Sequence, residues 1–100
     1  MAAYLFIKTK IRDREQYAKY VAAVRPLAAR WGSRFIVRSR PVEVLEGARD
    51  QWSDYLHLVS EWPSLEVARQ FWNSEEYRAV RALRADAGDV HVTLTEDLPV

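Results

Sequence analysis

Four stretches of the chain alternate between apolar and other side chains, and each is predicted to form a β-strand. They are Ala3–Ile11, Ser33–Arg40, Tyr55–Trp62 and Asp89–Glu96. The third stretch, which is predicted to lie near the middle of the sheet, has one apolar row and one row that includes His57 and Glu61. This combination predicts a sheet packed on helices behind, with a pocket or a partner in front.

Between these strands, apolar residues recur at three- and four-residue steps, which is typical of amphipathic helices. The first helix is predicted to start after Asp13 as N-cap and to stop at Gly32, with Pro26 kinking or dividing it. The second is predicted to start after Ser64, and Ser74 is predicted to cap a new helix after an interruption. The order β-α-β-β-α-β predicts a ferredoxin-like α+β fold: one antiparallel sheet with helices on one face.

The remaining segments are predicted to be irregular. Pro41 is expected to end the regular pairing of its strand or to mark an edge strand, with Val42–Leu45 as an extended continuation. Ala48–Asp54 is polar and is predicted to be a loop, and the tail Asp97–Val100 is expected to be loose.

The two faces of the sheet are predicted to differ in chemistry. The helix side is assigned the apolar rows Leu5, Ile7, Phe35, Val37, Leu56, Leu58, Val90, Val92 and Leu94. The opposite side is assigned a mixed set: Tyr4, Phe6, Lys8, Ile36, Arg38, Tyr55, His57, Val59, Glu61, His91 and Thr93. This set holds more large apolar groups than a sheet leaves in water, so two copies are expected to pack sheet to sheet as a homodimer.

Composition narrows the class of protein. The 100 residues are predicted to form a single domain, residues 1–100, and the net charge of +1 gives no long-range attraction for a polyanion. The chain has no cysteine, which excludes disulfides and thiolate metal sites and fits a reducing cytoplasm. The opening MAAYLFIK lacks a basic leader, and no segment approaches the ~18 apolar residues of a membrane span, so we expect a cytoplasmic protein without a membrane partner.

Three segments resemble a bacterial family known as domain of unknown function 1330. They are the opening AAYLFIKTKIRDREQYAKY, then VRSRPVEVLEG, and then SEWPSLEVARQFWNSEEYRAVRALR. Glu75 stands where that family usually has proline, and Ser39-Arg40 stands where it often has two glycines. The resemblance implies a dimeric α/β barrel, from a superfamily of cofactor-independent oxygenases, isomerases, cyclases and haem-handling proteins with a cavity between sheet and helices.

The strongest candidate catalytic set is Arg38, Glu61 and His57, with His91 and Lys8, all assigned by parity to one face of the sheet. A guanidinium can hold an anionic or enolic oxygen, and an imidazole or carboxylate can move a proton. Tyr77 would assist. The alternative is that Arg38 and Glu61 pair with each other or support a dimer interface.

Four residues are candidates for substrate binding: Arg38, Arg84, His91 and Ser74. In segments that carry the resemblance, Arg84 would hold a substrate carboxylate or pair with Glu76, and Tyr77 would place a hydroxyl at a pocket mouth. The alternative interpretation is helix capping by Ser74, a buried tyrosine and a supporting arginine.

No cofactor and no metal is predicted. His57, His91 and Glu61 are a conceivable ligand set, but their spacing does not bring them together, and an axial role in haem binding has no support in the sequence. Arg34, Arg38 and Arg40 raise the question of nucleic-acid binding, because RNA-recognition modules share this strand order. Since YLHLVSEW lacks their aromatic signature, no nucleic-acid partner is expected.

These observations predict a protein that binds a small organic molecule in a cavity beside the sheet. The enzymatic version is a cofactor-independent oxygenase, isomerase or cyclase that acts on a small organic acid, phenol or quinone. The alternative is a non-catalytic ligand-binding or assembly module, and the sequence does not decide between them.

Overall fold

The computed structural model describes residues 1–47 and 52–97. The elements run in the order β1 (Ala3–Ile11), α1 (Arg14–Arg30), β2 (Arg34–Pro41), β3 (Leu56–Trp62), α3 (Leu65–Trp72), α4 (Glu75–Ala82) and β4 (Gly88–Glu96). All four predicted strands are confirmed, each to within one residue at either end.

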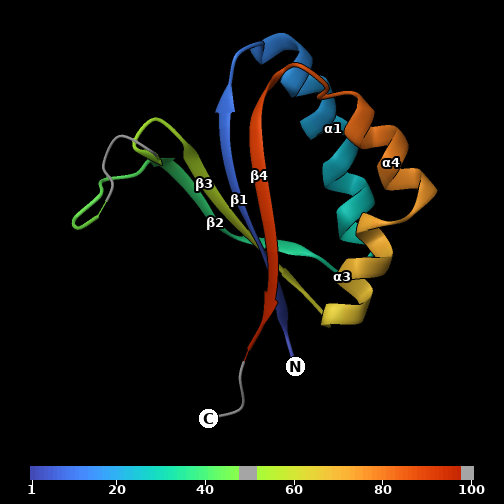
Figure 1. Cartoon of the computed structure of the whole chain (residues 1–100). Helices are drawn as coiled ribbons and strands as arrows, with labels where there is room; N and C mark the ends of the chain where they lie inside the picture. The colour runs from blue at the N-terminus through green and yellow to red at the C-terminus, as the bar shows by residue number, and fades with distance from the viewer. Residues whose placement is uncertain (48–51, 98–100) are drawn as a thin grey trace.

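The strands form one antiparallel sheet in the order β2-β3-β1-β4. β3 lies between β2 and β1, so its predicted place in the interior of the sheet is confirmed. Figure 1 shows α1, α3 and α4 on one side of the sheet, and no helix of residues 1–47 or 52–97 covers the other side. This is the ferredoxin-like α+β arrangement that the order of elements predicted.

Each of the three predicted N-cap residues accepts a hydrogen bond at the start of its helix. Asp13 accepts a hydrogen bond from the backbone N–H of Gln16 at the start of α1, at 3.1 Å. Ser64 and Ser74 accept equivalent bonds at the starts of α3 and α4. α1 continues through Pro26 without a break, so the predicted division of this helix is wrong; it ends before Gly32, whose φ of 85° suits glycine.

A β-bulge in β2 changes which side chains face the helices. Phe35 pairs with Ser60, but the next paired residue is Val37, opposite Val59, so Ile36 is the extra residue. Beyond the bulge the alternation is reversed. Val37 therefore lies on the open face and Arg38 on the helix side, and the opposite placement predicted for both is wrong.

The core lies between the sheet and the helices. Its buried members are Ala3, Leu5, Val24, Leu27, Trp62, Ala68, Phe71 and Tyr77. Aromatic rings form its centre: Phe71 packs at a tilted angle against Trp62 and against Tyr77, with ring centroids 4.6 Å apart in each case. α1 packs closely along α4.

The predicted irregular segments are partly described. Residues 42–45 form no strand, and the loop prediction for Ala48–Asp54 falls mainly outside the described residues. Of the predicted loose tail, Asp97 is described and is tied down: its N–H bonds to Ala2 and its carboxylate accepts from the Tyr4 hydroxyl at 3.0 Å. The rest of the tail lies outside the described residues.

Candidate functional site

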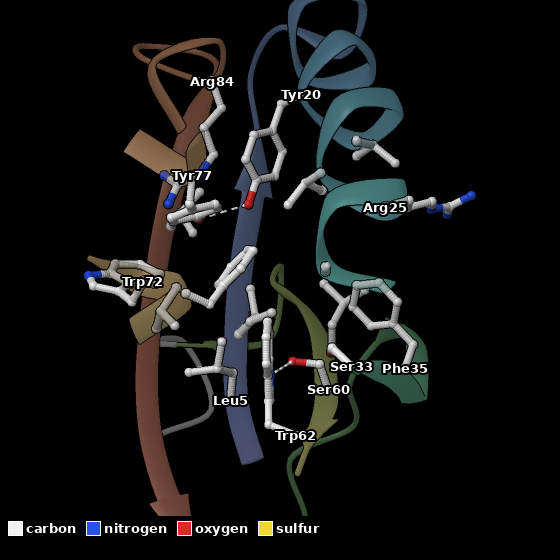
Figure 2. Close-up of a pocket in the computed structure, with 18 of the residues that line it drawn as sticks. Leu5, Tyr20, Arg25, Ser33, Phe35, Ser60, Trp62, Trp72, Tyr77 and Arg84 are labelled. Carbon is white, nitrogen blue, oxygen red and sulfur yellow. Dashed lines mark hydrogen bonds between the residues drawn. The ribbon is translucent and has the colours of Figure 1, made fainter. Parts of the chain in front are cut away.

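A cavity of about 110 Å³ lies in the space between α1 and the sheet. Its walls are mostly apolar and come from all four strands and from α1, α3 and α4. They include Leu5, Ile7, Val21, Val24, Leu58, Phe71, Val90 and Val92. Figure 2 shows Tyr20 and Tyr77 at one end of this space, Ser33 and Phe35 toward the other end, and Arg25 pointing away from it. The volume approaches that of an engineered apolar cavity of about 150 Å³ that binds benzene.

One end of the cavity is polar. The hydroxyls of Tyr20, from α1, and Tyr77, from α4, are 3.0 Å apart and share a hydrogen bond. Arg84, which follows α4, places its guanidinium 5.2 Å from the centre of the Tyr20 ring. These three residues, called the tyrosine–arginine cluster below, join the two helices at the cavity wall.

The electrostatics of the tyrosine–arginine cluster favour negative charge on a guest. Burial, and then the adjacent Tyr77 hydroxyl, raises the pKa of Tyr20 well above its ordinary value, so the Tyr20 hydroxyl remains protonated at neutral pH. Burial alone would lower the pKa of Arg84, but the neighbouring Tyr77 and Tyr20 oxygens outweigh it, and the guanidinium stays charged. No Asp or Glu occurs among the described residues that line the cavity.

The floor of the cavity carries a second polar pair. The indole N–H of Trp62 donates to the hydroxyl of Ser60 at 2.9 Å, and both residues are buried. This bond satisfies the indole N–H, while the Ser60 hydroxyl keeps its own hydrogen as one donor. Most of the other residues that line the cavity away from the tyrosine–arginine cluster are apolar.

The cavity collects three of the predicted site residues: Arg38, Tyr77 and Arg84. Arg38 lies at the β2 side, with its guanidinium 5.4 Å from the Phe35 ring. The Tyr77 side chain is 3% exposed. This burial agrees with the alternative interpretation, in which Tyr77 is a buried tyrosine, and not with a hydroxyl placed at the mouth of a pocket. Glu76 pairs with Arg30 at 3.6 Å, so the predicted alternative pairing with Arg84 is not formed.

Ser74 does not offer its hydroxyl to the cavity. Its oxygen accepts from the Tyr77 N–H at 3.1 Å, and its hydrogen is donated to the Phe71 carbonyl at 2.7 Å. Both bonds belong to the junction between α3 and α4. The geometry corresponds to the capping interpretation.

Glu61 and His57 lie on the open face, on the other side of the sheet from Arg38. Glu61 forms an ion pair with Arg34 at 2.8 Å. The predicted alternative pairing of Glu61 with Arg38 is not formed. His57 lies opposite Lys8 in the sheet register, and His91 lies opposite Lys8 from the other side. The predicted catalytic set is thus divided: Lys8, His57 and His91 share one row, and Arg38 is separated from them by the sheet.

His91 belongs to a cluster at one end of the open face. Its ring stands edge-on to Trp52, with centroids 5.2 Å apart, and its Nε2 lies 3.2 Å from a carboxylate oxygen of Asp89. Tyr55 donates a hydrogen bond to the same carboxylate, and Lys8 lies over the Trp52 ring at 4.1 Å. The hydroxyl of Tyr55, followed by His91, lowers the pKa of Asp89.

Sequence reasoning missed Tyr20, Ser60 and Trp62 as parts of the cavity wall. Tyr20 recurs at helical spacing with apolar neighbours and was therefore assigned to the core stripe of its helix. The available signal was the three-residue spacing from Tyr17 together with Arg84, but it becomes visible only once α1 and α4 are known to be neighbours.

Metal-binding and membrane-spanning features are absent from the described part of the chain. Within residues 1–47 and 52–97, no three His, Cys, Asp or Glu side chains lie together as a metal site would require. None of the helices in these ranges combines the length and the apolar character needed to cross a bilayer.

The fold and the cavity define a ferredoxin-like α+β protein with a space between helices and sheet. Residues 2–98 match the family described as domain of unknown function (DUF1330), so the chain belongs to that family. The resemblance inferred from the sequence is confirmed. A comparison with curated proteins finds no match.

Solved structures share the fold at low sequence identity. A protein of unknown function from Rhodopseudomonas palustris, RPA0582, is 20% identical with a TM-score of 0.78, over 99% of this chain and 84% of that one. A putative antibiotic biosynthesis monooxygenase from Caulobacter crescentus is 11% identical (TM-score 0.57; 98% and 91% covered). A dimeric ferredoxin-like protein of unknown function from Jannaschia sp. CCS1 is 8% identical (TM-score 0.61; 97% and 100%).

Proposed function

We propose that this protein binds a small, largely apolar organic molecule in the cavity between α1 and the sheet. The observation that carries the proposal is the cavity itself: about 110 Å³ of space inside a small core, walled by aliphatic and aromatic side chains and polar at one end. Ligand sites typically combine apolar walls with a few polar groups that fix orientation. A core of this size normally closes such a space unless a guest fills it.

Binding is favoured over catalysis by the division of the predicted catalytic set. A cofactor-independent enzyme that works by proton transfer needs a group that accepts a proton at the cavity. Glu61 and His57 lie across the sheet from the cavity, and no Asp, Glu or His occurs among its described lining residues. The monooxygenase-like relative supports an enzymatic version through its fold alone, and in that version Tyr77, Tyr20 and Arg84 would have to act.

A cavity-filling substitution tests the proposal. Ala28 lines the cavity from α1, and its neighbour Ala29 is exposed on the same helix. A thermal-shift screen of small acids, phenols and quinones should find ligands of the wild type, with affinities measured by calorimetry. Ala28→Leu should abolish this binding while Ala29→Leu retains it, because only the first side chain enters the space. Equal binding by both variants would place the ligand elsewhere.

We also propose a homodimer formed through the open face of the sheet. Phe6, Ile36 and Val37 are each more than two-fifths exposed on this face, at 42%, 45% and 43%. The Arg34–Glu61 pair and the Lys8 row surround them with both signs of charge, which is suited to a second copy of the same surface. The Jannaschia relative, described as dimeric, supports this arrangement.

A further inference from the structure

The tyrosine–arginine cluster has hydrogen-bond donors in excess of acceptors. Tyr20 and Tyr77 share one hydrogen between their hydroxyls, so one hydroxyl keeps a hydrogen to donate. The Nε of Arg84 is buried, and no described residue accepts a hydrogen bond from it. A buried donor without an acceptor is costly, and the cost is greater when the group is charged.

The charge of Arg84 is also uncompensated among the described residues. The ion pairs found within residues 1–47 and 52–97 use Lys10, Arg30, Arg34 and His91 as their cations. Arg84 is half-buried and packs instead against the face of the Tyr20 ring. A cation in this position is stabilised by an anion placed beside it.

We propose that Arg84, Tyr20 and Tyr77 bind the carboxylate of a small apolar monoacid whose hydrocarbon part fills the cavity. This inference rests on the proposed function and specifies its ligand. A carboxylate has two oxygens and fits a guanidinium edge plus one hydroxyl, because charge-assisted bonds of this kind are short and directional. A single negative charge matches the one guanidinium of the cluster, whereas a phosphate ester would bring a second charge into an apolar space.

The size of the cavity limits the hydrocarbon part to about one six-membered ring or a short branched chain. The mostly apolar walls contact this part, and the indole N–H at the floor is already donated to Ser60. Benzoate and isovalerate are therefore suitable probes. Benzamide and isovaleramide are their neutral counterparts of nearly the same shape.

Calorimetry at neutral pH with these four compounds tests the inference. The wild type should bind each acid about ten-fold to a hundred-fold more tightly than its amide, which is the expected value of charged over neutral hydrogen bonds. Arg84→Gln should remove this preference and leave the amide affinity within about two-fold, because the apolar contacts remain. Arg78→Gln is the matched control, since Arg78 is exposed on α4 and does not line the cavity.

Circular dichroism checks that the Arg84→Gln protein folds. If it does not, Arg84→Lys carries the test: it keeps the charge and should retain a reduced preference for the acid. Equal affinity of the wild type for acid and amide overturns the carboxylate assignment and leaves the proposed cavity binding intact. Preference that persists in Arg84→Gln, or is lost equally in Arg78→Gln, overturns the role of Arg84. Failure of both acids and amides to bind overturns the carboxylate assignment, and the proposed function fails as well if the wider screen finds no ligand.

Discussion

Tyr20 and Tyr77 meet through their hydroxyls where α1 faces α4, and this contact makes the stability of the protein sensitive to alkaline pH. Burial is the main reason that the pKa of Tyr20 is raised. The folded state therefore keeps a proton that the unfolded chain releases near its ordinary pKa of about 10. By linkage, the free energy of unfolding is unaffected below that pH and falls as the pH rises above it.

Substitution of Tyr20 tests this directly. Tyr20→Phe should lower the free energy of unfolding by about 1 kcal/mol at neutral pH, because one hydrogen bond is lost. It should also make the decline above about pH 10 shallower, since one buried ionisable group is gone. A shallower decline is expected rather than none, because hydrogen bonds to Asp97 and Asp89 also raise the pKa values of Tyr4 and Tyr55. Urea unfolding at a series of pH values measures both effects; an unchanged alkaline slope would contradict the account.

Individual site residues differed in how well the sequence predicted them. Tyr77 and Arg84 were identified because they lie in the segment that resembles the family. Tyr20 was not, because a tyrosine at helical spacing has the same periodicity as a core residue and only tertiary contact reveals its hydroxyl. Arg38 lines the cavity, but the sequence alternation assigned it to the other face of the sheet.

At the scale of elements, the strands and helix starts were predictable because local chemistry determines them. Asp13, Ser64 and Ser74 each provide a side-chain oxygen where the first backbone N–H groups of a helix need one. The bulge in β2 was not predictable, because it depends on how β2 pairs with β3 and neither strand shows this in its own pattern. One inserted residue then reversed the faces of Val37 and Arg38.

The junction of α3 and α4 gives a prediction at this scale. Ser74→Ala removes the cap of α4, whose first turns carry Tyr77, and should lower the free energy of unfolding by about 1 kcal/mol. Ligand affinity should stay within about two-fold, because the Ser74 hydroxyl is already engaged by the backbone. Urea unfolding and calorimetry measure the two quantities. A large loss of affinity with little loss of stability would instead assign Ser74 to substrate binding.

For the whole molecule, the two faces of the sheet have different proposed roles. The helix side encloses the cavity, and the open face carries exposed apolar groups with charges around them. Sequence alternation predicted this asymmetry well, since a face of mixed apolar and ionic residues is unusual for a surface in water. It did not predict that the catalytic candidates would be divided between the faces.

The proposed dimer is tested by a charge placed on the open face. Phe6→Glu should convert a dimer to a monomer in light scattering, because two new carboxylates would face each other at the centre of the interface. Leu83→Glu is the control: Leu83 is 41% exposed, similar to Phe6 at 42%, but follows α4 on the helix side. A wild-type monomer, or a Leu83→Glu variant that dissociates equally, would contradict the proposed interface.

The central claim is that a small molecule occupies the cavity between α1 and the sheet, and the indole N–H signals in a proton–nitrogen NMR titration test it most directly. Trp62 forms the buried floor of the cavity, whereas Trp52 lies on the open face beside Lys8 and His91. Titration with a ligand from the screen should shift the Trp62 signal and leave the Trp52 signal, assigned with Trp52→Phe, in place. A shift of the Trp52 signal with no change at Trp62 would contradict the account.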